Sequence, residues 1–146
     1  MSKTIGANGK TRFEFRLDAG SGVPVYRQMI DQVMGGIAAG ALEVGTQLPT
    51  VRQVAVDLAI NPNTVMRAYR ELEIRGVLET QQGTGTFIAR QKTARDAFER
   101  ERQLAQLASE FVARAGAAGF TLRELVKELQ ERQNESRTNK KESQER

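Results

Sequence analysis

Two helix-start signals lie close together in the middle of this 146-residue chain. Thr50 is followed three residues later by Gln53, which is the pattern of a capping box. Asn61 stands directly before Pro62, and proline is favoured at the first helical position. Gly76 is a typical helix stop. Because only a turn of roughly three to four residues separates the two short helices, the pattern predicts a helix-turn-helix.

A hairpin follows these two helices. Residues 77–80 and 86–88 are short runs rich in apolar and β-branched side chains, which are typical of strands. The polar segment 81–85 between them contains two glycines, as a hairpin tip favours. A helix-turn-helix with an adjoining hairpin is a winged helix-turn-helix. The side chains expected to be buried on the two helices are Val51, Val54, Ala55, Leu58, Val65, Ala68, Tyr69 and Leu72.

The residues before this motif predict a strand and a first helix. Apolar and charged side chains alternate over 12–18, which is the period of a half-buried strand. A helix is expected from near Pro24 to a stop at Gly40. The pair Gly35–Gly36 inside it costs roughly 1 kcal/mol per glycine relative to alanine, so either something packs closely there or the helix is locally weak. Residues 1–11 are expected to form a flexible arm.

Composition excludes much catalytic chemistry. The chain has no His and no Cys, so imidazole bases, thiol nucleophiles and Cys-ligated metals are ruled out. We expect no enzyme activity, no cofactor and no metal. No apolar run approaches the roughly 18 residues of a membrane span, so the chain is expected to be cytoplasmic and to have no membrane partner. The net charge is +4, but residues 12–90 carry as many acidic as basic side chains.

The second predicted helix offers a polar face. At about 100° per residue, Asn63, Arg67 and Arg70 lie within one arc, opposite the apolar stripe. Amide, hydroxyl and guanidinium groups suit base edges and phosphates. These residues could also have a purely structural role, because Arg70 could pair with Glu71 or Glu73 and the cap residues could serve only as helix caps. The predicted DNA-binding residues are Thr50, Arg52, Asn61, Asn63, Thr64, Arg67, Arg70, Gly83, Thr84 and Gly85.

The stretch 24–88 resembles the DNA-binding head of GntR-family bacterial repressors. The matching pieces are PVYRQMIDQV and GTQLPTVRQVAVDLAINPNTVMRAYRELEIRGVLETQQGTGTF, and the wording NPNTVMRAYRELE is similar to the YtrA-like subfamily. Heads of this family often carry Arg at the positions held here by Pro62 and Met66, so contacts made by those arginines do not carry over. The resemblance implies a DNA-binding transcriptional regulator that dimerises through its short tail.

Residues 91–130 predict two helices with an apolar face. Thr121 with Glu124 forms another capping box after the break at 116–119. This segment is too short to enclose a sizeable ligand pocket, so the face suggests a partner chain, although it could fold back on the head. A small effector stays an open question. The predicted dimer-interface residues are Phe98, Leu104, Leu107, Phe111, Leu122, Leu125 and Leu129.

The fold expected is mainly α with a small β wing. A winged helix-turn-helix head over 12–90 precedes the helical dimerisation segment, and the tail 131–146, which lacks apolar residues, is expected to be disordered. The function expected is a homodimeric repressor that binds double-stranded DNA at an inverted repeat. The helix at 62–75 would enter the major groove and the wing at 77–88 would touch flanking DNA. The neutral charge of the head keeps one alternative, a winged-helix protein–protein adaptor.

Overall fold

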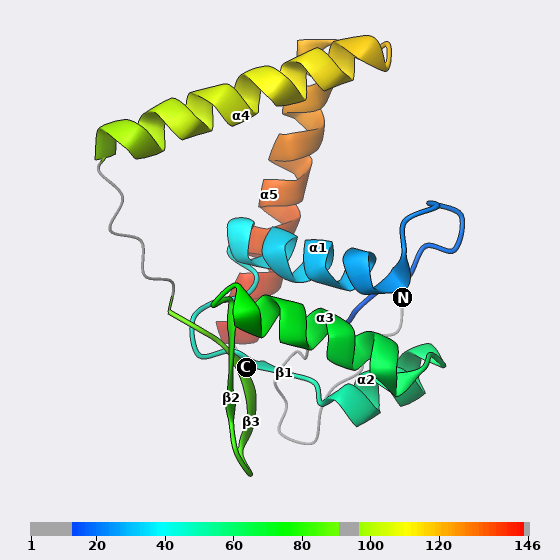
Figure 1. Ribbon diagram of the computed structural model, residues 1–146. Helices are drawn as coiled ribbons and strands as arrows, with labels where there is room; N and C mark the ends of the chain where they lie inside the picture. Colours follow the sequence, from blue (N-terminus) through cyan, green and yellow to red (C-terminus); the bar gives the residue numbers. More distant parts are fainter. Residues whose placement is uncertain (1–12, 91–96, 145–146) are drawn as a thin grey trace. The chain divides into compact units, whose positions relative to one another are not determined.

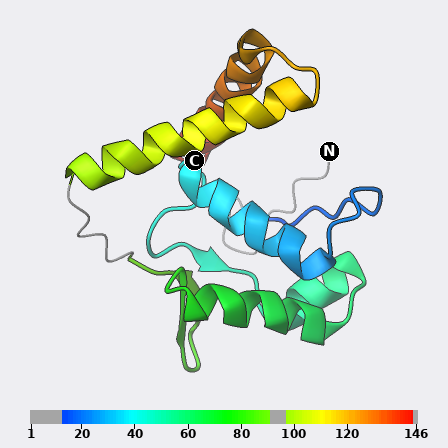
Figure 2. The same ribbon diagram turned by 45° about the horizontal axis from the view of Figure 1, so that its top comes forward.

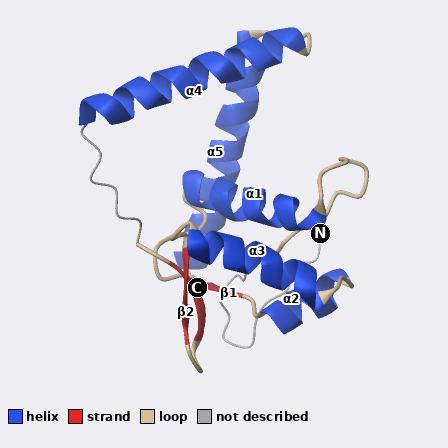
Figure 3. Ribbon diagram, in the orientation of Figure 1, coloured by secondary structure: helices blue, strands red, loops and turns tan. Residues whose placement is uncertain are grey.

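The computed structural model describes residues 13–90 and 97–144, with side chains to residue 138 (Figures 1 and 3). The chain divides into two compact units, and each is described by itself. The head consists of α1 (Val25–Ala38), β1 (Gln47–Leu48), α2 (Val51–Leu58), α3 (Pro62–Ile74), β2 (Leu78–Gln81) and β3 (Gly85–Ile88). Two further helices, α4 (Ala97–Ala117) and α5 (Leu122–Gln144), follow the head, and the second unit spans residues 92–136.

The core of the head forms around α3. Both α1 and α2 pack against this helix, and the two views in Figures 1 and 2 agree that α1 lies along it. The apolar stripe of α3 is buried as the sequence predicts, which confirms the helix-turn-helix. The largest fully buried side chains are Met29, Ile30, Val33, Val65 and Leu72.

Three antiparallel strands form the sheet, in the order β1-β3-β2. β2 and β3 are the predicted hairpin, with Leu78 opposite Ile88. β1 was not predicted, since a strand of two residues is too short to show an alternating pattern. Leu48 of β1 pairs with Thr86 and is buried, so β1 joins the wing to the core.

The predicted strand over 12–18 is wrong for the described residues 13–18, which belong to no sheet. Their alternation is real, because Phe15 is buried. Two glutamines of α1 take the place of a partner strand. The Gln32 side chain accepts from the Arg16 N–H at 2.8 Å and donates to its carbonyl at 2.6 Å, and Gln28 pairs with both backbone groups of Asp18. These side-chain amides satisfy the backbone groups that a sheet would otherwise satisfy.

The glycine pair in α1 resolves into two different situations. A Cβ on Gly36 would lie 2.9 Å from Cδ1 of Leu42, whereas a Cβ on Gly35 would meet nothing within 4 Å. Close packing therefore explains Gly36, one of the two readings predicted from the sequence. Gly40, at φ +76°, follows the end of the helix as expected.

The second unit keeps its predicted helix start but not its predicted tail. The Thr121 N–H donates to Glu124 at 2.8 Å, and Glu124 N–H donates to the Thr121 hydroxyl at 3.3 Å, so the capping box is present. The expected disordered tail 131–146 is at variance with the structure, in which α5 continues to Gln144. Ion pairs one turn apart, such as Arg132 to Glu128 at 2.9 Å, support the helix where this tail begins.

α4 and α5 bury none of their large apolar side chains within the described part of the chain. The two helices do not pack along each other there. Phe98 is 73 % exposed and Phe111 is 55 % exposed. No described helix is long and apolar enough to cross a membrane.

Candidate nucleic-acid interface

The turn between α2 and α3 is set by two caps and one left-handed residue. The side chain of Thr50 accepts a hydrogen bond from the Gln53 N–H at 3.2 Å, and that of Asn61 accepts from the Asn63 N–H at 2.8 Å. Ala59 ends α2 with φ +52°. Thr50 and Asn61 thus have a structural role independent of any ligand, since each side chain caps a helix N–H that would otherwise lack a partner.

Tyr69 fixes α3 against the residues that precede α2. Its ring is buried, and its hydroxyl donates a hydrogen bond to the carbonyl of Pro49. The phenol is therefore a core group with a satisfied polar end. This contact holds α3 in place from its inner side and leaves its outer side to the solvent.

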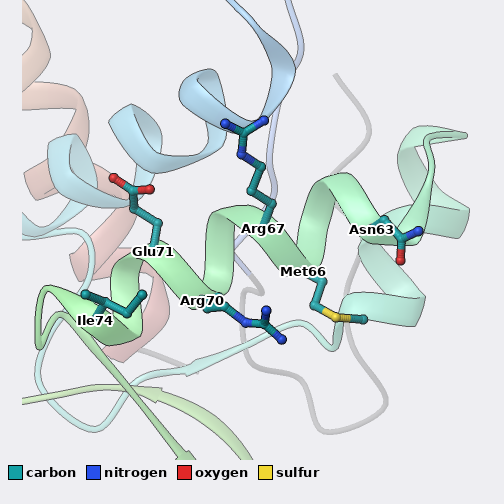
Figure 4. Close-up of a pocket in the computed structure, with 6 residues that line it drawn as sticks. All are labelled: Asn63, Met66, Arg67, Arg70, Glu71 and Ile74. Atoms are coloured by element: carbon teal, nitrogen blue, oxygen red, sulfur yellow. The ribbon is translucent and has the colours of Figure 1, made fainter.

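The outer face of α3 is polar with two apolar members, Met66 and Ile74. Asn63, Met66, Arg67 and Arg70 are exposed, and together with Glu71 and Ile74 they line a shallow open hollow. Figure 4 shows Met66 and Arg70 on one side of the helix and Arg67 on the other.

Arg67 departs from the predicted arc. Its guanidinium carbon lies 3.8 Å from the centroid of the Tyr26 ring, which comes from α1. A guanidinium over an aromatic face is held by the ring quadrupole, by about 0.5–1 kcal/mol at an exposed site. Arg67 is therefore directed toward α1, away from Asn63 and Arg70, and its charge is offered at the seam between α1 and α3.

Arg70 forms no ion pair with the acidic residues beside it, Glu71 and Glu73. Glu71 forms an ion pair with Arg75 at 2.5 Å, and Glu73 accepts a hydrogen bond from the Thr80 hydroxyl at 2.6 Å. No ion pair joins Arg70 to another residue in the ranges that the structure describes. Of the two readings open from the sequence, the structure favours the one in which Arg70 is available to a ligand.

The wing tip is a tight turn held from β1. Gly83 has φ +76° and Gly85 has φ +141°, both in the region that glycine tolerates best. A Cβ on Gly85 would clash with the side-chain nitrogen of Gln47, which donates to the Thr84 carbonyl at 3.1 Å. The two glycines are thus required by the turn, and Gln82 and Thr84 are the exposed side chains of the tip.

The remaining predicted residues differ in exposure. Arg52 is exposed in the first turn of α2, and Thr64 is half-buried in the first turn of α3. The described residues contain no cluster of three or more acidic side chains that could hold a metal ion.

Sequence reasoning missed three residues that shape this surface. Met66 was noted only because related heads often carry an arginine there, although its helical position placed it beside Asn63 and Arg70. Tyr26 lies in the predicted first helix, and nothing local indicated its contact with Arg67. Gln47 lies in a strand that the sequence did not reveal.

Comparisons with known proteins converge on one family. The family model described as "Bacterial regulatory proteins, gntR family" matches residues 25–88. The HTH-type transcriptional regulator Rv1152 of Mycobacterium tuberculosis is 42 % identical over 114 residues, which cover 78 % of this chain and 89 % of that protein. The HTH-type transcriptional repressor YtrA of Bacillus subtilis is 42 % identical over 74 residues, or 51 % of this chain and 57 % of that protein.

Solved structures agree over most of the chain. A transcriptional antiterminator from Listeria monocytogenes EGD-e superposes with a TM-score of 0.61 at 28 % identity, over 82 % of this chain and 90 % of that one. A transcriptional regulator from Oenococcus oeni superposes with a TM-score of 0.51 at 34 % identity, over 79 % and 95 %. The combination of head and short helical unit is therefore shared with solved structures.

Proposed function

This chain belongs to the GntR family of DNA-binding transcriptional regulators, and from that premise we propose that it is a homodimeric repressor of an inverted-repeat operator. The observation that carries the proposal is the outer face of α3. The inner side of this helix is buried in the core, while an amide and an uncommitted guanidinium stand on its outer side. Such groups are the ones that read base edges.

Each head inserts α3 into the major groove. A helix of 13 residues is about 20 Å long and about 10–12 Å wide with its side chains, which suits a groove about 12 Å wide. Asn63 and Arg70 face the bases, with Thr64 at the edge of the contact. Arg67, stacked on Tyr26, and Arg52 reach backbone phosphates, which fix the register of the protein on the duplex without specifying sequence.

The wing contacts the DNA beside the groove that α3 occupies. Its tip carries backbone N–H groups and the Thr84 hydroxyl, both of which can donate to phosphate oxygens. The Gln47 side chain holds the turn in shape, so Gly83 and Gly85 act through the backbone conformation they permit.

A second copy of the chain covers the apolar face of α4 and α5. Scattered exposed apolar residues are ordinary, but a succession of them along two helices that do not pack together marks an interaction surface. The proposed interface consists of Phe98, Leu104, Leu107, Phe111, Leu122, Leu125 and Leu129. The buried cluster of the head lies wholly within residues 13–89, which supports the head as a unit that folds alone. Sedimentation of residues 1–90 is expected to give a monomer and the full chain a dimer, and a dimeric truncation would place the interface elsewhere.

Repression is proposed because a relative of similar sequence carries that description in its name, the YtrA repressor of Bacillus subtilis. The test is selection of fragmented host genomic DNA on the purified full chain, followed by sequencing. A few promoters that share an inverted repeat support a dimeric operator-binding protein. Specific recovery only after small metabolites are added indicates an effector.

Salt dependence separates this function from the adaptor alternative. Affinity for duplex DNA is expected to fall steeply with salt, and Arg52→Ala to lower the slope of log affinity against log salt by about one. A chain with weak, salt-insensitive affinity for every duplex would instead support a winged helix that binds a protein.

A further inference from the structure

An apolar side chain lies among the polar ones on the outer face of α3. Met66 is 44 % exposed, and it lines the same hollow as Asn63 and Arg70 (Figure 4). It belongs neither to the buried cluster of the head nor to the partly buried residues packed against that cluster. Its side chain therefore makes no core contact that would require an apolar residue at this position.

We propose that Met66 reads a thymine through its C5-methyl group, as a specificity-determining residue of the DNA-binding face. The inference rests on the proposed function. Base edges in the major groove present hydrogen-bond donors and acceptors, and the thymine methyl is the one apolar group among them. Methionine has no donor and only a weak sulfur acceptor, so any other base edge placed against it would lose a polar partner. Its unbranched, polarizable side chain adapts readily to a methyl group.

The position of Met66 along α3 supports contact with a base. It lies four residues after Pro62, so its Cα is about 6 Å along the axis from the start of the helix. The N-terminal half of a helix-turn-helix recognition helix is the part that contacts base edges. Ile74, which is 81 % exposed, stands about 12 Å further along and is not expected to reach them.

The side chains on either side of Met66 restrict what the position can read. Asn63 is one turn earlier and can pair with adenine, and Arg70 is one turn later and can pair with guanine. Met66 between them supplies no hydrogen bond, so its contribution to specificity depends on a methyl group alone. Removal of that methyl is therefore a selective perturbation.

The test uses the full chain and the duplex selected from a random DNA library. Each thymine in turn is replaced by uracil, which forms the same base pair and lacks the methyl group. Burial of one methyl group predicts about a fourfold loss of affinity at one thymine in each half-site. Met66→Ala is expected to bind the thymine and uracil duplexes equally, and Met66→Leu to keep the preference. Val56→Ala, at an exposed apolar residue of α2, is the matched control and is expected to keep the uracil penalty.

The outcomes distinguish failure of the Met66 inference from failure of the proposed DNA-binding function. A wild-type chain that binds its selected duplex tightly but is indifferent to every uracil overturns the reading of Met66 and leaves the proposed function standing. Retention of the full uracil penalty by Met66→Ala has the same meaning. A selection that yields no preferred duplex refutes sequence-specific binding, and the role of Met66 falls with it.

Discussion

Substitution of the two adjacent glycines of α1 by alanine is expected to change stability in opposite directions. Gly35 is exposed, and a Cβ there meets nothing. At Gly36 the new methyl group would lie 2.9 Å from Cδ1 and 3.1 Å from Cγ of Leu42, and 3.5 Å from the Phe13 ring. Leu42 is only 3 % exposed, so its side chain has little room to move away.

The magnitudes follow from these distances. Gly35→Ala gains about 0.5–1 kcal/mol because alanine loses less backbone entropy in a helix. Gly36→Ala has the same gain but must also overpack the core, which costs typically 1–3 kcal/mol. The free energy of unfolding is therefore expected to be about 1–3 kcal/mol lower for Gly36→Ala than for Gly35→Ala. In a domain of this size each kcal/mol shifts the Tm by roughly 4–8 °C.

The assay is thermal unfolding of the two full-length variants, followed by far-ultraviolet circular dichroism at one protein concentration. Equal concentration matters because self-association makes the Tm concentration-dependent. Equal stabilisation by both alanines would refute the argument, since it would mean that Leu42 yields at no cost.

Three further predictions concern DNA, assembly and pH. Arg70→Ala is expected to weaken operator binding by roughly 1–3 kcal/mol and to relax base preference, whereas Arg67→Ala is expected to weaken binding to all sequences alike. Fluorescence anisotropy on matched duplexes measures both effects. A loss of base preference in Arg67→Ala, with a uniform loss in Arg70→Ala, would exchange the two roles. Phe111→Asp is expected to yield monomer in sedimentation without lowering the Tm of the head, and an unchanged dimer would remove Phe111 from the interface. The pKa of Glu124 is lowered, first by the hydrogen bond from the Thr121 N–H and second by the one from the Thr121 hydroxyl. The Glu124 carboxylate therefore stabilises α5 at neutral pH, and this stabilisation is lost as pH falls through the lowered pKa. Helix content of Glu124→Gln is expected to change less between pH 7 and about pH 3, and an identical acid response would show that this carboxylate does not matter.

The local signals in the sequence were sufficient for the two central helices and the hairpin. Thr50 and Asn61 act as the caps they were predicted to be, because capping depends on residues only two or three positions apart. The wing was predictable for the same reason, since two glycines and a polar tip specify the turn. The expectation that Asn63 and Arg70 share an exposed face followed from helical periodicity alone.

A pattern in the sequence reports burial and not the partner that provides it. The alternation over 13–18 was read as a strand, but its backbone partners are glutamine side chains. The DNA-binding role of Arg67 stays a prediction, but its contact with an aromatic ring of another helix could not be read from helical periodicity. The tail was expected to be disordered because it lacks apolar residues, yet α5 extends to Gln144.

The glutamine pairs on α1 also decide the register of the segment they hold. Strands in a sheet can slip by two residues and still find equivalent partners, whereas an amide on a helix occupies one fixed place. Gln28 and Gln32 are about 6 Å apart along α1, and the two residues they bind span about 6.6–6.8 Å of extended chain, so the spacings match. One residue added between Arg16 and Asp18 should therefore cost the segment half of this anchoring. The path by which the chain enters the head is thus specified by two amide side chains.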